Sequence, residues 1–269
     1  MQTRVLILFL FIHFAIFSQE NITLISWNIQ DLGRTKNDEE LEAIAQIIRD
    51  ADIVAIQEVV AGYGGAQAVA RLHDLLNRKG SNWDYVISNP TSSPKYASER
   101  YAIFWKTSKV KIKNRGALLS SLAKVVDREP FYLDFYLGDQ KFSILNFHSR
   151  PHNKYPEEEI KHISRFLQQS DFNHPIILAG DFNLDESDAV FDDLKATGFN
   201  VAITNTKTTL KRSCSDDYLS YAIDNIFYSS ILKLTASGSL DYVKSCEHLE
   251  EARKLSDHLP IYAAFEMQD

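Results

Sequence analysis

Asp181 and Asn183 follow an apolar run, residues 175–179, that ends at Gly180. Such a run is typical of a buried strand that delivers polar side chains at its carboxyl end. Because side chains alternate along an extended chain, Asp181 and Asn183 can face the same way. The carboxylate suits a hard cation, and the amide can donate a hydrogen bond to a phosphoryl oxygen. Taken alone, the pattern also fits a strand followed by an Asx turn.

Other apolar runs lie next to similar polar groups: Asn28 after residues 22–27, Gln57-Glu58 after 53–56, His148 after 142–147, Asp224 within 222–228, and Asp257 with His258 before 259–265. Ligand sites of α/β proteins gather at the ends of strands. The carboxylates and amides suit an oxygen-preferring cation such as Mg²⁺ or Mn²⁺. The two histidines, with carboxylates as partners, suit general acid–base catalysis. Each residue alone also has a structural explanation, such as a turn cap or a charge at a strand edge.

Helices and strands alternate in the first half of the chain, and strands dominate later. Residues 37–40 match a capping box and open a helix with apolar side chains at 41, 44, 47 and 48. A second helix ends at Gly80, and Pro156 opens a third. Residues 131–137 and 142–147 flank a Gly-Asp turn and predict a hairpin. We expect one α/β domain with a mixed sheet, or with two sheets face to face. Residues 201–220 and 230–250 give no clear pattern.

The composition fits one ordinary globular domain, with 269 residues, 45% hydrophobic and 24% charged. The formal net charge of −7 is unlike that of a passive nucleic-acid-binding protein. It is compatible with an enzyme that holds a phosphodiester locally through a metal ion and a few arginines.

Residues 1–18 match a secretory signal peptide, with Arg4 as the only charge and an apolar run that ends at Ser18. An uncleaved anchor is the alternative. We therefore expect a mature domain of residues 19–269 that is secreted or periplasmic, with no membrane attachment after cleavage. Cys214 and Cys246 are the only cysteines, so in an oxidising compartment they predict one disulfide, or else two separate thiols.

Short motifs link these residues to a known family. They occur in this order: Trp27-Asn28-Ile29-Gln30, Ile56-Gln57-Glu58-Val59, Ser98-Glu99-Arg100-Tyr101, Arg128-Glu129-Pro130, Phe147-His148-Ser149, Gly180-Asp181-Phe182-Asn183 and Ser256-Asp257-His258-Leu259-Pro260. The series resembles the endonuclease/exonuclease/phosphatase superfamily from about residue 22 to residue 265. The motifs around Glu99 and Arg128 resemble more narrowly the pancreatic-type deoxyribonucleases and their secreted bacterial counterparts.

The resemblance implies a four-layer α/β sandwich, in which two packed mixed sheets are flanked by helices. It also implies metal-dependent hydrolysis of a phosphodiester. Mg²⁺ or Mn²⁺ would be held by Glu58, with Asn28, Asp181 and Asp257 around it. A second, structural Ca²⁺ is an open possibility. DNA is the expected substrate, cut endonucleolytically by a monomer with no stable protein partner.

The resemblance further assigns a role to each remaining residue of the motifs. His258, oriented by Asp224, would deprotonate the attacking water. His148, paired with Glu99, would protonate the leaving oxygen. The phosphate would be bound by Arg128, Asn183 and Asn28. These roles agree with in-line displacement, which needs charge stabilised on both the attacking and the leaving oxygen.

Two departures from the pancreatic pattern concern residues that would bind DNA. Val60 stands where the pancreatic enzyme has an Arg for the minor groove, and Ala97 stands where it has a Tyr. A secreted sphingomyelinase-like enzyme, or another lipid or inositol phosphodiesterase, is therefore the alternative within the superfamily. A binding module on an inactive scaffold would lack one of Glu58, Asp181, Asp257 or His258, and all four are present.

Overall fold

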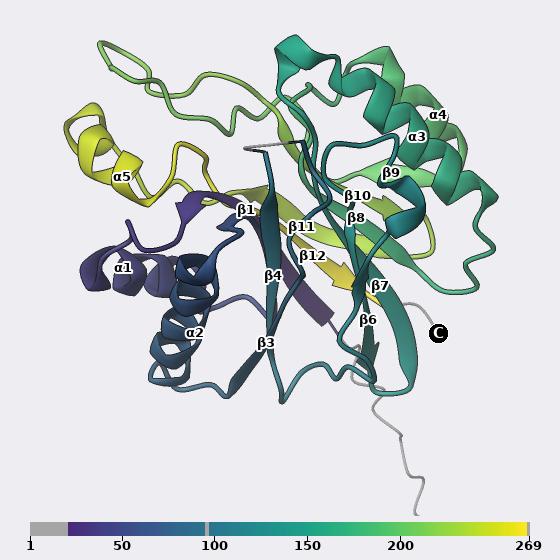
Figure 1. Cartoon of the computed structure of the whole chain (residues 1–269), viewed down its shortest axis with the longest axis horizontal. Coiled ribbons are helices and arrows are strands. Elements are labelled where there is room, and N and C mark those ends of the chain that lie inside the picture. Colours follow the sequence, from purple (N-terminus) through teal and green to yellow (C-terminus); the bar gives the residue numbers. More distant parts are fainter. Residues whose placement is uncertain (1–20, 95–96, 268–269) are drawn as a thin grey trace, which may run out of the picture.

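Two six-stranded sheets pack face to face, with helices covering both outer faces (Figure 1). This computed structural model describes residues 21–94 and 97–267, so the expected signal peptide, residues 1–18, lies outside the described residues. The arrangement confirms the four-layer α/β sandwich. Across the described ranges, no helix is long and apolar enough to cross a bilayer.

The first sheet has the strand order β11-β12-β1-β2-β4-β3. Its members are β1 (Asn21–Leu32), β2 (Ile53–Val60), β3 (Trp83–Ile87), β4 (Glu99–Lys106), β11 (Lys233–Ser239) and β12 (Ile261–Glu266). β1 and β2 run parallel because α1 (Asp38–Ile48) connects them as a crossover, and the other pairs are antiparallel.

The second sheet repeats this plan with the order β5-β6-β7-β8-β10-β9. Its members are β5 (Ala117–Leu118), β6 (Phe131–Leu137), β7 (Gln140–His148), β8 (Ile176–Asp181), β9 (Phe199–Val201) and β10 (Asp224–Ser229). β7 and β8 are parallel across α3 (Pro156–Gln169), and His148 pairs in register with Asp181. In each sheet the parallel pair therefore carries its polar residues at the carboxyl ends of both strands.

The helices cover the sheets through amphipathic faces. α1 and α2 (Tyr63–Asn77) pack on the first sheet, and α3 and α4 (Asp192–Ala196) pack on the second. α5 (Leu249–Leu255) packs beside α1 near the end of the chain. The capping box of α1 is confirmed, because Asn37 accepts from the amide of Glu40 and Glu40 accepts from the amide of Asn37.

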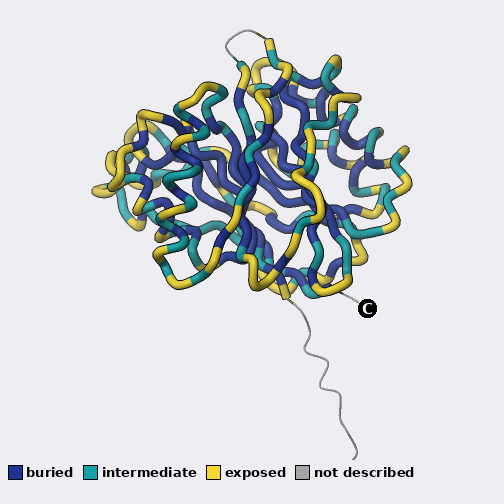
Figure 2. Tube along the Cα trace, turned by 60° about the horizontal axis from the view of Figure 1, so that its bottom comes forward, coloured by how far each residue is buried: buried dark blue, intermediate teal, exposed yellow. Residues whose placement is uncertain are grey.

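The core between the two sheets is apolar and continuous. It includes the aromatic side chains of Trp105, Phe135, Phe142 and Phe265, all nearly or fully buried. Figure 2 shows the central strands buried and the connecting loops exposed. Asn146 links the two sheets through polar contacts, because its Oδ1 accepts from Gln57 Nε2 over 2.6 Å and its Nδ2 donates to the carbonyl oxygen of Ile56 over 3.0 Å. Such close packing fixes the spacing of the strand ends that carry the site.

The sequence also suggests two short elements, a strand at residues 110–112 and a helix capped by Ser187, and the structure differs at both. The strand expected at residues 110–112 makes only a single bridge, between Lys111 and Tyr136. The helix expected to start at Ser187 begins instead with a 3-10 turn, Ala189–Phe191, capped by the side chain of Asp188. Both segments are too short for residue periodicity to fix their type or ends.

The segment that gave no pattern, residues 201–220, forms a long loop after β9. It is held by isolated bridges, including Thr209 with His258 and Leu210 with Leu219. The predicted disulfide is confirmed, and Cys214 and Cys246 join this loop to the 3-10 turn before α5. The loop is thereby fixed beside the residues that precede β12.

Candidate active site

The carboxyl ends of β1, β2, β7 and β8 meet at one edge of the sandwich, and Gly180 allows the approach of β7 to β8. Gly180 has φ 152°, and a Cβ atom there would lie 1.7 Å from the carbonyl oxygen of Phe147. Only glycine tolerates both conditions. The result is that Asp181 lies beside His148, with Oδ2 3.5 Å from Nε2.

Two site residues have left-handed backbone conformations that are rare for residues with side chains. Glu58 has φ 59° and Asn183 has φ 53°. Such conformations cost on the order of 1 kcal/mol and cluster at functional sites. The amide of Asn183 donates to Asp181 Oδ1 over 2.9 Å, and the amide of Glu58 faces Glu99 Oε1 at 3.4 Å. The backbone at both residues therefore leaves the extended strand conformation, and a carboxylate of the site binds the amide of each.

Oxygen atoms gather around Asn28, which is almost fully buried. Its Nδ2 donates to Glu58 Oε1 over 2.9 Å and to Asp181 Oδ2 over 3.1 Å. Its Oδ1 is buried without a hydrogen-bond partner. Asp257 Oδ2 accepts from Gln30 Nε2 over 3.2 Å, and its Oδ1 lies 4.0 Å from His258 Nε2. An unsatisfied amide oxygen beside two carboxylates is a donor set that fits Mg²⁺ or Mn²⁺.

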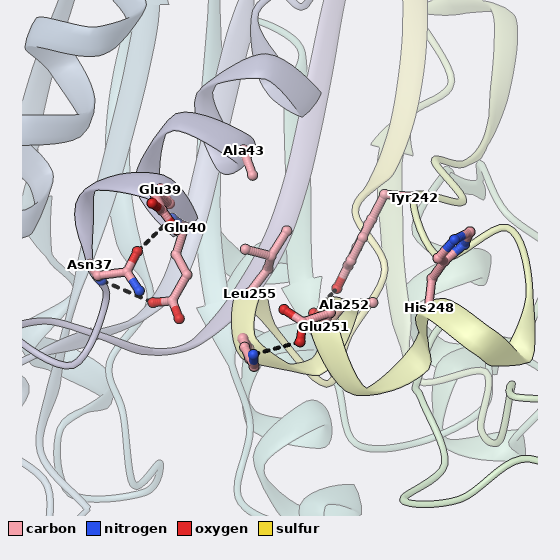
Figure 3. A pocket seen from close by; sticks show the side chains of 10 residues that line it. Asn37, Glu39, Glu40, Ala43, Tyr242, His248, Glu251, Ala252 and Leu255 are labelled. Atoms are coloured by element: carbon pink, nitrogen blue, oxygen red, sulfur yellow. Dashed lines mark hydrogen bonds and ion pairs between the residues drawn. The ribbon is translucent and has the colours of Figure 1, made fainter.

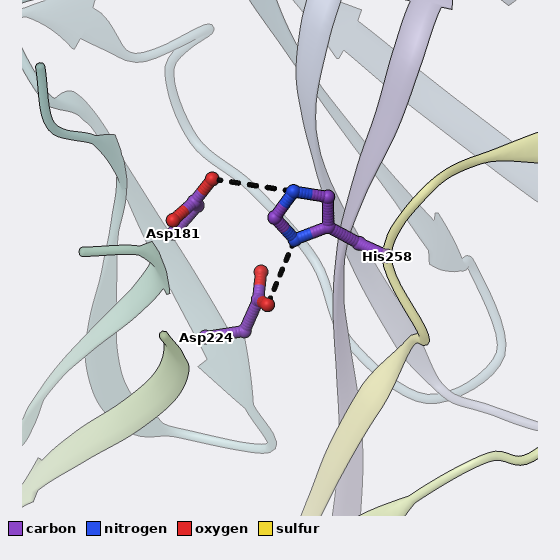
Figure 4. A group of neighbouring side chains, drawn as sticks. All are labelled: Asp181, Asp224 and His258. Atoms are coloured by element: carbon purple, nitrogen blue, oxygen red, sulfur yellow. Dashed lines mark hydrogen bonds and ion pairs between the residues drawn. The ribbon is translucent and has the colours of Figure 1, made fainter. Parts of the chain in front are cut away.

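His258 lies between two buried carboxylates (Figure 4). Its Nδ1 is 2.8 Å from Asp224 Oδ2, and its Nε2 is 3.7 Å from Asp181 Oδ2. Burial lowers the pKa of His258, but the charges of Asp224, Asp181 and Asp257 outweigh it and raise that pKa to about 10. Asp181, Asp224 and His258 also lie close enough together for one atom of each to ligate an ion.

Residues that hold His258 and Asp224 in place were missed in the sequence. Thr208 Oγ1 donates to Asp224 Oδ2 over 2.6 Å from within the loop that gave no pattern. Ser256 Oγ accepts from the amide of His258, and Trp27 Nε1 donates to its carbonyl oxygen. Ser256 and Trp27 lie inside the motifs quoted above, so their positions could have indicated a role in the site. Nothing in the sequence around Thr208 indicates such a role.

The second histidine has its own carboxylate and arginine. His148 Nδ1 lies 3.0 Å from Glu99 Oε2, and Arg128 Nε lies 3.0 Å from the same oxygen. Burial opposes charge on His148, yet Glu99 raises the pKa of His148 above its usual value. Arg128 Nη1 also donates to the carbonyl oxygen of Ser149 over 2.8 Å. Three charged side chains that are distant in sequence thus form one buried unit beside Asp181.

Glu159, on α3, supports this unit and was also missed. It is fully buried, accepts from the amides of Asp127 and Arg150, and lies 3.0 Å from Arg150 Nε. It therefore ties the segment before Arg128 to the segment after Ser149. In the sequence it is one of three consecutive glutamates at the start of a helix, a pattern that indicates exposed acidic side chains interacting with the helix dipole.

Two hollows flank the histidines. A cleft of about 260 Å³ lies on the side of Glu58, Glu99 and Arg128, and a cavity of about 680 Å³ lies on the side of Asn183. A further pocket between α1 and α5 is lined by acidic side chains that include Glu39, Glu40 and Glu251 (Figure 3). None of the expected site residues lines that pocket, and its carboxylates would repel a phosphodiester.

The structure thus brings all the predicted site residues to one edge of the sandwich: Asn28, Glu58, Glu99, Arg128, His148, Asp181, Asn183, Asp224, Asp257 and His258. No predicted site residue lies elsewhere in the fold. The four central strands contribute Asn28, Glu58, His148 and Asp181, and the loops beside them contribute most of the remainder.

Similarities to known proteins agree with this arrangement. The chain is 28% identical over 266 residues to a deoxyribonuclease of Thioalkalivibrio sp. (strain K90mix), covering 91% of this chain and 71% of that protein. The fold is similar to an endonuclease/exonuclease/phosphatase from Bacteroides vulgatus, with TM-score 0.67, 18% identity and coverage of 92% and 99%. It is also similar to a mannosyl-6-phosphatase from Bacteroides thetaiotaomicron, with TM-score 0.62, 19% identity and coverage of 90% and 98%.

A model of one family matches residues 25–258, which include every residue of the site described above. The two-sheet sandwich, the site at the strand ends and this match agree, and the chain belongs to the Endonuclease/Exonuclease/phosphatase family.

Proposed function

We propose that the protein is a secreted, divalent-metal-dependent deoxyribonuclease that cuts DNA endonucleolytically. One observation carries the proposal. The Nε2 atoms of His148 and His258 lie 3.5 Å and 3.7 Å from the same oxygen of Asp181, and each ring has its own carboxylate on Nδ1. A phosphate placed there would have one imidazole for the attacking water and one for the leaving oxygen.

Each histidine has one proton-transfer task in this scheme. His258 accepts the proton of the attacking water at Nε2, and Asp224 stabilises the imidazolium that forms. His148 gives a proton from Nε2 to the leaving oxygen, while Glu99 holds the opposite ring nitrogen. The histidines therefore act as a base and an acid in the same displacement.

Fixed donors bind the phosphate between the histidines. Asn183 presents its amide from a strained turn, and Arg128 supplies positive charge from its pairing with Glu99. Both are held before substrate arrives, so little reorganisation accompanies the reaction. Asn28, Glu58, Asp181 and Asp257 would hold the divalent ion. When bound, that ion would stabilise negative charge on the phosphoryl and leaving oxygens.

The choice of DNA rests on similarity to the Thioalkalivibrio deoxyribonuclease and on the surface. Over the parts of the chain that the structure describes, the exposed large apolar side chains are Tyr63, Tyr155, Tyr221 and Ile231, each on a different segment. Such scattered residues form no apolar patch for a lipid surface. No specific observation favours the sphingomyelinase-like alternative.

Incubation of the purified mature chain with supercoiled plasmid, RNA and sphingomyelin, each with Mg²⁺, Ca²⁺ or EDTA, tests the proposal. We expect nicked circles and then linear DNA with Mg²⁺, and none with EDTA. Hydrolysis of sphingomyelin without DNA nicking would contradict the proposal. The secreted state is tested by the mass of protein exported by the producing cell, which should lack residues 1–18. An exported form that keeps Met1 would contradict cleavage.

A further inference from the structure

The cavity beside Asn183 is not used by the mechanism above, although it opens next to the phosphate position. Its volume is about 680 Å³, within the range of small-molecule sites. It is bordered by residues from three segments: 151–153 after β7, 183–188 after β8 and 221–223 before β10. Ile223 precedes Asp224 directly, so the cavity adjoins both Asn183 and the partner of His258.

The lining of this cavity suits a flat, uncharged ring. Apolar contacts are offered by Leu184, Ile223 and Pro151, while His152 and Asn153 can make hydrogen bonds. Tyr221 lies at its border with 68% of its surface exposed. An exposed aromatic ring beside an apolar wall is the arrangement on which nucleobases stack.

Two other occupants fit this cavity less well, one because of charge and one because of its aromatic lining. Asp185 and Asp188 line the cavity, so a second phosphate group would be repelled there. A quaternary ammonium group would be attracted by these carboxylates, but such groups are usually enclosed by a cage of Trp, Tyr or Phe rings, and Tyr221 is the one such residue that lines the cavity. A nucleobase fits the cavity better than either group, because it carries no charge that Asp185 and Asp188 would repel and it needs only one aromatic ring for stacking.

We propose that this cavity is a nucleobase subsite, in which a base next to the scissile phosphate stacks on Tyr221. The inference rests on the proposed function, because a phosphodiester must lie at Asn183 for its base to reach the cavity. A base in the cavity cannot remain stacked and paired in a duplex. The protein should therefore cut single-stranded DNA faster than duplex DNA of the same sequence.

The side chain of Tyr221 can be changed with little risk to the fold. Its backbone is held by hydrogen bonds to residues 208 and 209, whereas its ring is mostly exposed. Tyr221→Ala removes the stacking face, and Tyr221→Phe is the matched control that keeps it. Neither change touches the residues that hold the phosphate or the metal ion.

The test uses single-stranded tetranucleotides in which only the central linkage is a phosphodiester and the outer linkages are uncharged methylphosphonates. One substrate carries all bases, and two others lack the base on the 5′ or the 3′ side of the central linkage. We expect removal of one of these two bases to lower kcat/KM of the wild-type protein about 10-fold. Tyr221→Ala should lower it about 10-fold on the complete substrate and leave it unchanged on that abasic one. Tyr221→Phe should stay within about 2-fold of wild type.

Equal losses for Tyr221→Ala on complete and abasic substrates would overturn the subsite, as would a wild-type protein indifferent to both bases. Loss of sphingomyelin hydrolysis in Tyr221→Ala, with nucleotide cleavage unchanged, would assign the cavity to choline and overturn the proposal too. If the wild-type protein cuts neither these substrates nor plasmid DNA, the proposed function itself fails, and the subsite fails with it.

Discussion

Replacing Asp224 with Asn keeps the size of a buried side chain but removes the charge beside His258. Burial lowers the pKa of His258, and the carboxylates of Asp224, Asp181 and Asp257 together raise it from 6.5 to about 10. Asp224 is the nearest of the three, and its Oδ2 lies 2.8 Å from Nδ1 of His258. A hydrogen bond to a charged group contributes about 1.5–3 kcal/mol, so losing it as the imidazolium forms in the transition state should lower kcat ~10²-fold.

Steady-state nicking of supercoiled plasmid, with circular dichroism to confirm folding, measures this effect. Thr208→Val is the matched control, because it removes one hydrogen bond to Asp224 Oδ2 and keeps the charge. That control should lose only about 5-fold, as expected for about 1 kcal/mol. The double variant Asp224→Asn with His258→Ala should be no slower than His258→Ala alone, because residues that act as a unit are not additive. A folded Asp224→Asn protein with wild-type kcat would refute the pairing.

Three further predictions concern the rest of the site and the disulfide. Glu58→Gln keeps the side-chain shape but removes a charge that a hard cation needs, so the protein should require at least ~10-fold more Mg²⁺ for half-maximal nicking; an unchanged Mg²⁺ titration would remove Glu58 from the metal site. Glu99→Gln should lower kcat on the order of 10²-fold, like His148→Ala, because Nδ1 of His148 loses its anionic partner at 3.0 Å; a folded variant with full turnover would contradict this role. Replacing Cys214 and Cys246 with Ser should lower the free energy of unfolding by about 3–4 kcal/mol, as estimated for a loop closed over 32 residues; urea melts that superimpose on wild type would contradict it.

The alternating helices and strands of the first half could be predicted because each element is long and regular. α1 shows this most clearly, with its capping box and a period of 3.6 in its apolar residues. The polar residues at strand ends also predicted the site, since parallel strands place their carboxyl ends at one edge. The second half was harder, because β9 and β11 are short or half-exposed. β9 has three residues and β11 has one large apolar side chain, Leu234, so neither gives a pattern long or apolar enough to identify a strand.

Supporting contacts could not be predicted where the chain gives no local pattern. Thr208 reaches Asp224 only because the disulfide and the bridge between Thr209 and His258 fold its loop back. Glu159 looks like a surface charge at a helix start, yet it is fully buried against the segments that flank Arg128 and Ser149. Both contacts depend on tertiary packing between segments that are far apart in sequence. Residue types and local spacing therefore do not predict these two contacts.

The central claim is that His148 and His258 act as acid and base on one phosphodiester, and a set of alanine variants tests it most directly. The measurement is the plasmid nicking rate with saturating Mg²⁺ for His148→Ala, His258→Ala and the double variant, with circular dichroism as the check on folding. Each single variant should lose on the order of 10²-fold or more. The double variant should lose far less than the product of the two single losses. A well-folded His258→Ala protein that nicks plasmid at the wild-type rate would contradict the assignment.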